Sequence, residues 1–285
     1  EIASCLVGSE MCIRDRKGPV TEALPVGCVV TIAASGSEGS TDSVVTLVTE
    51  DGKQYKSCAD GDILRPLFAI MNPELMMTLP PYQTASGVSD IFAHCLERYF
   101  SDTPDCELTD RMLEAVMLTM LKEGRRVMKN PNDYEARANI MWAAMVAQNN
   151  ITGVGRAQDW GTHHMDNEIG INYGASHGAG LALLFPYWME YAIKAKGPEK
   201  FVKFATRIFG CQNDFEHPEV TAMEGVKLLR AFFDELGMPN SISSLGGKPE
   251  DIPGMVENMF YGAPNHGNFI KLTPEIAAEI YSMAM

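Results

Sequence analysis

The chain has 285 residues, of which 46% are hydrophobic, and its formal net charge is −14 with a pI near 4.8. This length is enough for one large domain, or two ordinary ones, with a proper apolar core. The negative charge argues against a nucleic-acid partner, and no run of about 18 apolar residues is present to cross a membrane. We therefore expect neither kind of partner and a cytoplasmic location.

The cysteines and the first residues carry little functional information. Seven cysteines are scattered along the chain without a CxxC pair, which is typical of reduced thiols in a cytosolic protein. Residues 1–16 fit nothing that follows and lack the layout of a signal peptide. We interpret them as foreign to the fold, with an initial helix or a disordered tail as the alternatives.

Residues 17–79 have the character of an α/β layer. Short apolar, β-branched runs predict strands over 26–32, 43–49 and 66–71. Between the first two runs lies the small-residue loop 33–41, whose backbone N–H groups could approach a phosphate closely, although an ordinary loop has the same composition. No GxGxxG or Walker loop is present, and so few strands do not make a sheet covered on both faces.

The remainder, residues 80–285, is predicted to be an all-helical domain. Thr109 is a plausible N-cap, and Pro186 should kink its helix or begin a new turn. We expect helices over 82–100, 109–128, 133–149, 178–195, 198–209, 221–236, 249–259 and 273–283.

Four polar residues in this helical part suit a metal. Asp90 and His94 are four residues apart on a predicted helix, so both side chains lie on one face. His163 lies just before or inside a short helix, and His177 begins another. One carboxylate and three imidazoles would accept iron(II), zinc, manganese or nickel. For Asp90 and His94 taken alone, the alternative is a helix N-cap and a buried histidine bonded to a backbone carbonyl.

The other three histidines are weaker candidates. His164 should point away from His163 on a helix, and His217 and His266 lie in polar stretches typical of the surface. Nucleophilic catalysis has no support, because neither a GxSxG elbow nor a cysteine with a locally placed histidine is present.

Four stretches in matching order give the chain its resemblance to a known family. It resembles the iron-containing (group III) alcohol dehydrogenases, and most closely their butanol dehydrogenase-like branch, over roughly residues 17–285. The stretches are TIAASGSE (31–38), PLFAIMNPE (66–74), TLPPYQTASGVSDIFAHCLERYF (78–100), and DWGTH (159–163) through SHGAGLA (176–182).

The resemblance implies a fold and a set of functional residues. Members have a Rossmann-like N-terminal domain and a helical C-terminal domain, the architecture shared with dehydroquinate synthase, and the active site lies between them. The metal, iron first among the candidates, falls on the catalytic set Asp90, His94, His163 and His177. NADP or NAD contacts fall on Thr31, Ser35, Gly36, Ser37, Lys56 and Thr78. The parent protein is expected to be a homodimer.

Three departures from the family pattern stand out. The GGGS pyrophosphate loop and the strands before it are missing, so residues 17–79 read as a remnant of the cofactor domain. Asn167 stands where a histidine near the nicotinamide is usual, and Asn72 stands where aspartate is usual.

The expected function is a metal-dependent, NAD(P)-linked oxidoreductase that interconverts primary alcohols and aldehydes. Two alternatives stay open at this point. One is a related polyol dehydrogenase, and the other is a helical fragment that binds metal without catalysis.

Overall fold

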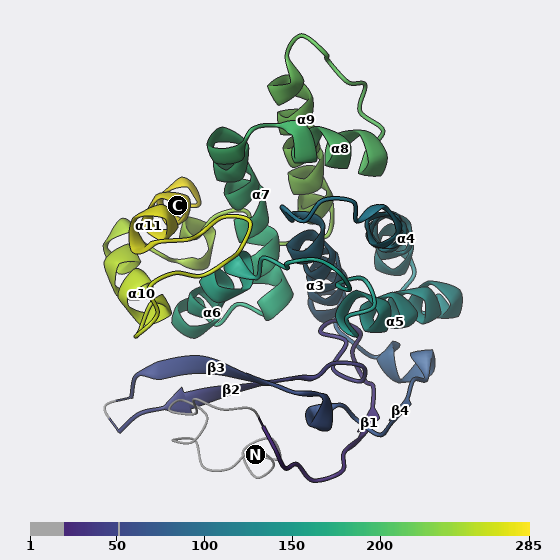
Figure 1. Cartoon of the computed structure of the whole chain (residues 1–285). Helices are drawn as coiled ribbons and strands as arrows, with labels where there is room; N and C mark the ends of the chain where they lie inside the picture. Colours follow the sequence, from purple (N-terminus) through teal and green to yellow (C-terminus); the bar gives the residue numbers. More distant parts are fainter. Residues whose placement is uncertain (1–19, 51) are drawn as a thin grey trace.

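The computed structural model describes residues 20–50 and 52–285. The interpretation of residues 1–16 as foreign lies outside these ranges. Figure 1 shows the strand-bearing region as a thin layer along one side of a larger body of helices. In the described residues no helix is long and apolar enough to cross a membrane.

Within the described residues, the strand-bearing region contains two separate pairs of strands. Strand β1 (Gly27–Val29) runs parallel to β4 (Phe68–Ile70), and β2 (Asp42–Val48) runs antiparallel to β3 (Gln54–Asp60). The strands predicted over 26–32, 43–49 and 66–71 correspond to β1, β2 and β4, whereas β3 was not predicted. Its sequence, QYKSCAD, is too polar to read as a buried strand, and it is held instead by its register against β2.

Two short helical turns connect the strands to the helices. They are η1 (Asp62–Leu64) and η2 (Pro73–Met76). The side chain of Asn72 accepts a hydrogen bond from the backbone N–H of Glu74 at 3.1 Å and so caps η2. An aspartate would cap the same turn, so the departure at Asn72 keeps the local structure intact.

Every predicted helix is present, and one further helix was only partly anticipated. Helix α6 (Gly161–Tyr173) is longer than the short helix expected near His163. Thr109 is not the N-cap of α4, because that helix begins earlier and the Thr109 hydroxyl donates to the carbonyl of Cys106 at 3.2 Å. Helix α7 continues through Pro186. The others are α3 (Pro81–Tyr99), α4 (Glu107–Lys129), α5 (Tyr134–Gln148), α7 (His177–Lys196), α8 (Glu199–Ile208), α9 (Pro218–Glu235), η3 (Ser243–Leu245), η4 (Pro249–Asp251), α10 (Ile252–Met259) and α11 (Pro274–Met283).

Helix α3 is the centre of the helical body. Every residue from Thr84 to Tyr99 is buried, including polar ones such as Ser89 and Asp90, so this helix is enclosed on all sides by its neighbours. Helix α7 approaches it closely at Gly178, where an added Cβ would lie 1.9 Å from the carbonyl oxygen of Ser86. A glycine is therefore required for α3 and α7 to meet, and these two helices carry three of the residues predicted to bind metal.

The loop 33–41 is fixed directly against the helices. A Cβ on Gly87 of α3 would lie 2.2 Å from the carbonyl oxygen of Ala33, so the absence of a side chain lets the loop reach the helix. Gly36 has a φ of +57°, and a Cβ there would lie 2.5 Å from the carbonyl oxygen of Ala144 in α5. The predicted cofactor loop is thus held by packing on α3 and α5 rather than by the strands alone.

Candidate metal centre

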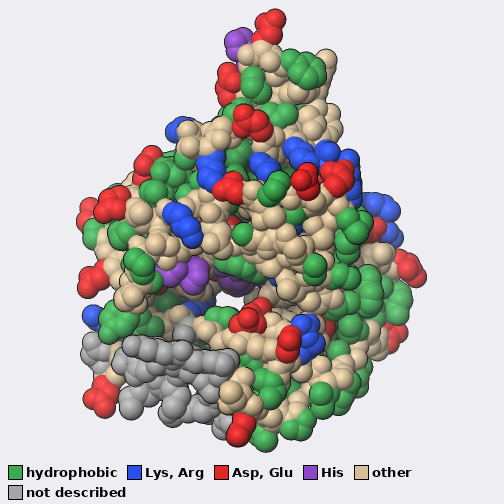
Figure 2. All heavy atoms as spheres, in the orientation of Figure 1, with side chains coloured by type: hydrophobic (Ala, Val, Ile, Leu, Met, Phe, Trp, Pro, Cys, Tyr) green, Lys and Arg blue, Asp and Glu red, His purple; other side chains and the backbone are tan. Residues whose placement is uncertain are grey.

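Three helices bring the four predicted metal ligands to one place. Asp90 and His94 lie on α3, His163 lies in the first turn of α6, and His177 is the first residue of α7. Figure 2 shows histidine side chains gathered at a hollow between the helical body and the strand-bearing region.

The donor atoms converge to within coordination range of a single ion. One atom each from Asp90, His163 and His177 lies within 4.8 Å of the other two. His94 is adjacent to this group, with its Nε2 atom 3.7 Å from Asp90 Oδ1 and its ring stacked on that of His163 at a centroid distance of 5.0 Å. In the part of the chain that the structure describes, no other group of three such side chains converges in this way.

Buried donor atoms without hydrogen bonds make the residues fit a cation. Asp90 and His94 are only 2% and 3% exposed. Asp90 Oδ1 and His163 Nε2 are both buried and have no hydrogen-bond partner among the described residues. Buried polar atoms are rarely left unpaired, because losing their hydration costs about 1–3 kcal/mol each. A divalent metal would satisfy both atoms.

The excess of buried carboxylates at the site also fits a bound cation. The carboxylates of Asp90, Glu97 and Asp166 are buried, and each forms ion pairs only with histidine among the described residues. Burial raises the pKa of Asp90 to about 6 and that of Glu97 to about 8. Uncompensated negative charge in a buried site is costly, and a divalent cation would offset it.

The histidines are held in states that suit metal binding. Burial lowers the pKa of His94 and of His163 well below the usual range, so both imidazoles are neutral near pH 7. Burial also acts to lower the pKa of His177, but the nearby Asp90 and Asp166 carboxylates outweigh it and raise that pKa to about 9. A cation at this site would compete with the proton on His177.

The remaining histidines lie apart from this group. His164 is exposed, and its ring stacks on that of His266 at 4.0 Å. His266 is half-buried rather than a surface residue, and its Nε2 atom donates to the carbonyl of Met259 at 3.0 Å. His217 is exposed, as its polar surroundings indicate.

Lys56 extends from the strand-bearing region toward the same helices. It lies half-buried on β3, and its Nζ atom would be 3.1 Å from a Cβ placed on Gly170 of α6. Its positive charge acts on both Glu168 and His177. The strand-bearing region thus contributes a positive charge that acts on a residue of the candidate site.

The other predicted cofactor contacts are mostly exposed. Ser35 and Ser37 are exposed on the loop that Gly36 anchors, and Thr31 is exposed just before it. Thr78 is exposed in the turn that leads into α3. Five of the six predicted contacts thus lie on or beside segments packed against α3 or α5, and the sixth, Lys56, acts electrostatically on His177.

Asn167 lies one turn beyond His163 on α6. It is half-buried, and the same face continues to Gly170, beside Lys56. Asn167 therefore lies between His163 and Gly170 along one face of α6.

Two residues of the site, Glu97 and Asp166, were not identified from the sequence. His163 Nδ1 lies 2.6 Å from Glu97 Oε1, and His177 Nδ1 pairs with Asp166 Oδ2. Each acid stands three residues after a predicted ligand, at His94-x-x-Glu97 and His163-x-x-Asp166. That spacing was the available signal, but it pairs each acid with a histidine on a different helix.

The comparison with protein families decides the identity. The family described as "Fe-containing alcohol dehydrogenase family, C-terminal" matches residues 84–285, a segment that contains all four predicted ligands. The chain belongs to the iron-containing alcohol dehydrogenase family. This confirms the resemblance drawn from the sequence.

Individual relatives within the iron-containing alcohol dehydrogenases agree. The chain is 32% identical over 267 residues to the NADPH-dependent aldehyde reductase YqhD of Escherichia coli, covering 93% of this chain and 67% of that protein. It is 34% identical over 227 residues to NADH-dependent butanol dehydrogenase A of Clostridium acetobutylicum, covering 80% and 57%. The chain thus spans between 57% and 67% of the length of these two relatives.

Solved structures confirm the fold class. The crystal structure of NADH-dependent butanol dehydrogenase A from Thermotoga maritima superposes with a TM-score of 0.90 at 31% identity, covering 97% of this chain and 70% of that one. The α/β piece followed by an all-helical region is therefore the iron-containing alcohol dehydrogenase architecture, as the sequence predicted.

Proposed function

We propose that this chain carries the metal-binding part of an NAD(P)-linked oxidoreductase that interconverts primary alcohols and aldehydes. The observation that carries the proposal is the convergence of Asp90, His163 and His177 donor atoms within 4.8 Å, beside His94. The names of the relatives supply the substrate class, since they are an aldehyde reductase and a butanol dehydrogenase.

The four side chains Asp90, His94, His163 and His177 would hold the metal, with iron as the first candidate and zinc, manganese or nickel as alternatives. When bound, a divalent metal supplies the Lewis acidity that polarises an alcohol or aldehyde oxygen for hydride transfer. The protein contributes position and electrostatics, since the redox chemistry belongs to the nicotinamide cofactor.

Residues of the strand-bearing region would orient that cofactor. Loop 33–41 offers Ser35, Ser37 and the backbone around Gly36, while Lys56 places a cation beside α6. Thr31 and Thr78 border the same segments. Either NAD or NADP suits these groups, and the two relatives named above differ in the same respect.

The proton released or taken up during the reaction needs a separate route. Asn167 lies one turn from His163 on α6 but has no titratable group, so it would position a substrate oxygen and cannot act as an acid or base. Water in the hollow or a substrate hydroxyl would carry the proton. The expected homodimer and cytoplasmic location belong to the same proposal.

The direct test combines metal loading with cofactor oxidation. The purified chain is loaded with Fe²⁺ or Zn²⁺, and NADPH or NADH oxidation with butanal is followed at 340 nm, about 25 °C and pH 7. We expect turnover that depends on the added metal and disappears in His177→Ala. His217→Ala, at an exposed histidine far from the site, should behave as wild type.

A second candidate is a non-catalytic metal-binding module, because all four predicted ligands lie on helices of the chain. A helical module that binds metal without catalysis would take up one metal ion per chain and bind neither NADH nor NADPH. Cofactor titration by fluorescence separates the two candidates. Full activity and full metal content in His177→Ala would contradict both.

A further inference from the structure

Two buried carboxylates outside the predicted ligand set are each paired with a ligand histidine. Glu97 on α3 is 1% exposed, and Asp166 on α6 is fully buried. Glu97 contacts His163 on α6, and Asp166 contacts His177 on α7. Glu97 therefore links α3 to α6, and Asp166 links α6 to α7.

The contact of Glu97 defines which nitrogen of His163 is free. Glu97 Oε1 accepts a hydrogen bond from the backbone N–H of His163 at 3.0 Å. The same oxygen lies 2.6 Å from the Nδ1 atom of the His163 ring. An oxygen that accepts from the backbone presents lone pairs to this residue, so Nδ1 carries the proton and donates. Nε2 is left with its lone pair, and it is the buried atom that has no partner among the described residues.

Asp166 contacts the Nδ1 atom of His177 as Glu97 contacts that of His163, and it has little free space around it. Its Oδ2 atom pairs with His177 Nδ1, while His177 Nε2 lies 3.7 Å from Asp90 Oδ1. A Cβ on Gly180 of α7 would lie 1.8 Å from Asp166 Oδ1. The glycine therefore makes room for the carboxylate, one turn along the helix that begins with its histidine.

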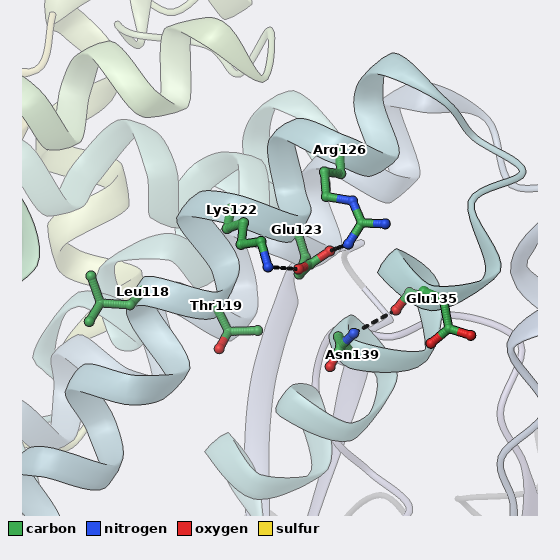
Figure 3. A pocket seen from close by; sticks show the side chains of 7 residues that line it. All are labelled: Leu118, Thr119, Lys122, Glu123, Arg126, Glu135 and Asn139. Atoms are coloured by element: carbon green, nitrogen blue, oxygen red, sulfur yellow. Dashed lines mark hydrogen bonds and ion pairs between the residues drawn. The ribbon is translucent and has the colours of Figure 1, made fainter.

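A buried carboxylate outside the candidate site, Glu123, has different partners. Glu123 on α4 is also buried, and it lies between Lys122 at 3.2 Å and Arg126 at 2.7 Å (Figure 3). Glu97 and Asp166 form no such pair with a lysine or arginine within the described residues. Their only ion-pair partners are histidines whose other nitrogen faces the converging donor atoms.

We infer that Glu97 and Asp166 are positioning residues of the metal centre, which fix the ring orientation and the Nδ1–H tautomer of His163 and His177 so that both present Nε2 to the metal. This inference rests on the proposed function, because it needs a metal at Asp90, His94, His163 and His177. Carboxylates behind metal-bound histidines also make the imidazole a stronger donor, and losing one typically weakens metal binding about 10- to 100-fold.

The first test compares Glu97→Gln and Asp166→Asn with the control Glu123→Gln. Zinc affinity is measured by competition with a chelator, and folding is checked by circular dichroism. We expect roughly 10- to 100-fold weaker zinc binding in the two site variants and a change below about twofold in the control. Unchanged affinity in either folded site variant overturns its assignment. A loss as large in Glu123→Gln overturns the contrast with this carboxylate outside the site.

The second test does not depend on whether the variants fold. Histidine-selective ¹⁵N NMR of the zinc-loaded wild-type chain reports which ring nitrogen carries a proton. We expect Nδ1–H and a zinc-bound Nε2 for His163 and His177, and the opposite tautomer at either ring would overturn the inference. Failure of the wild type to bind zinc would instead contradict the proposed function, so the two failures are distinguishable.

Discussion

The strand-bearing region and the helical body of this protein differ in how much of their apolar surface is buried. In the described part of the strand region the strands pair only in twos, and Phe68 of β4 is 63% exposed although it is a large apolar residue. In the helical body α3 is buried along nearly its whole length, and Phe100 at its end packs against Trp188 and Phe201. Burial of apolar area is the main stabilising term, so the helices carry most of the stability.

The predicted metal ligands and the predicted cofactor contacts are divided between the same two regions. All four predicted metal ligands lie on helices, whereas all six predicted cofactor contacts lie between residues 31 and 78. Metal affinity and cofactor affinity should therefore respond to different substitutions. The contacts that join the two regions, such as Asp42 to Gln148 and Gln54 to Asn258, decide how far one influences the other.

The largest contrast is expected between two phenylalanines. Phe100→Ala removes a fully buried ring and should lower the free energy of unfolding by about 3–5 kcal/mol. Phe68→Ala removes an exposed ring and should cost less than about 1 kcal/mol. Urea denaturation of both variants measures the difference, and comparable losses would break the division between the regions.

Metal removal is expected to have the next largest effect. A cation present at about 100 times its dissociation constant should stabilise the folded chain by about 2.7 kcal/mol. For a chain of this size, that corresponds to a Tm increase of roughly 5–10 °C, which EDTA should reverse. His177→Ala should show no such increase, whereas His217→Ala should keep it. A metal-dependent Tm in His177→Ala would remove this residue from the site.

Glu168 predicts a pH dependence at the contact between the regions. Asn258 Nδ2 donates to both carboxylate oxygens of Glu168, at 2.9 and 3.0 Å, and to the carbonyl of Gln54 at 3.1 Å. Burial raises the pKa of Glu168 to about 7. The folded chain thus binds this proton more tightly than the unfolded chain, and the resulting stability is present at low pH and lost as the pH rises through about 7.

Glu168→Gln should therefore gain stability relative to wild type as the pH rises from about 5 to 8, by about 2 kcal/mol. Thermal melts across this range measure the change, and the exposed Glu250→Gln serves as the control. A constant difference between Glu168→Gln and wild type would show that the carboxylate does not titrate in this window.

The smallest expected effect is that of a substitution at Lys56, which should weaken cofactor binding without changing metal binding. Lys56→Ala should weaken NADH or NADPH binding about tenfold, because a charged hydrogen bond contributes roughly 1.5–3 kcal/mol. Its zinc affinity should stay within about twofold of wild type, since no ligand is lost. Lys53→Ala, exposed near the turn of the same hairpin, should leave both unchanged. Equal losses of zinc and cofactor affinity would show that the two regions act as one unit.

The helices were readable from sequence because their apolar residues repeat with a helical period. Helix α3 was predicted over 82–100 and runs from Pro81 to Tyr99. Strand β3 was missed because its side chains alternate without an apolar face and its pairing with β2 is non-local. Helix α6 was anticipated only in part, because glycines begin and interrupt a polar sequence whose burial comes from neighbouring helices.

The candidate site could also be predicted from the sequence only in part. The spacing of Asp90 and His94 places them on one helix face, but nothing local indicates that His163 and His177 come from two further helices to meet them. Glu97 and Asp166 escaped notice because each serves a histidine on another helix, which only the packing of α3, α6 and α7 brings close. The spacing of residues along a chain does not show which helices will pack together in the folded structure.

The most direct test of the metal centre is an anomalous X-ray difference map from crystals of the chain loaded with zinc. We predict one peak, bound by Asp90, His94, His163 and His177, with histidine nitrogens at about 2.0–2.1 Å from the ion. A peak beside the stacked rings of His164 and His266, or no peak at the four side chains, would contradict the assignment.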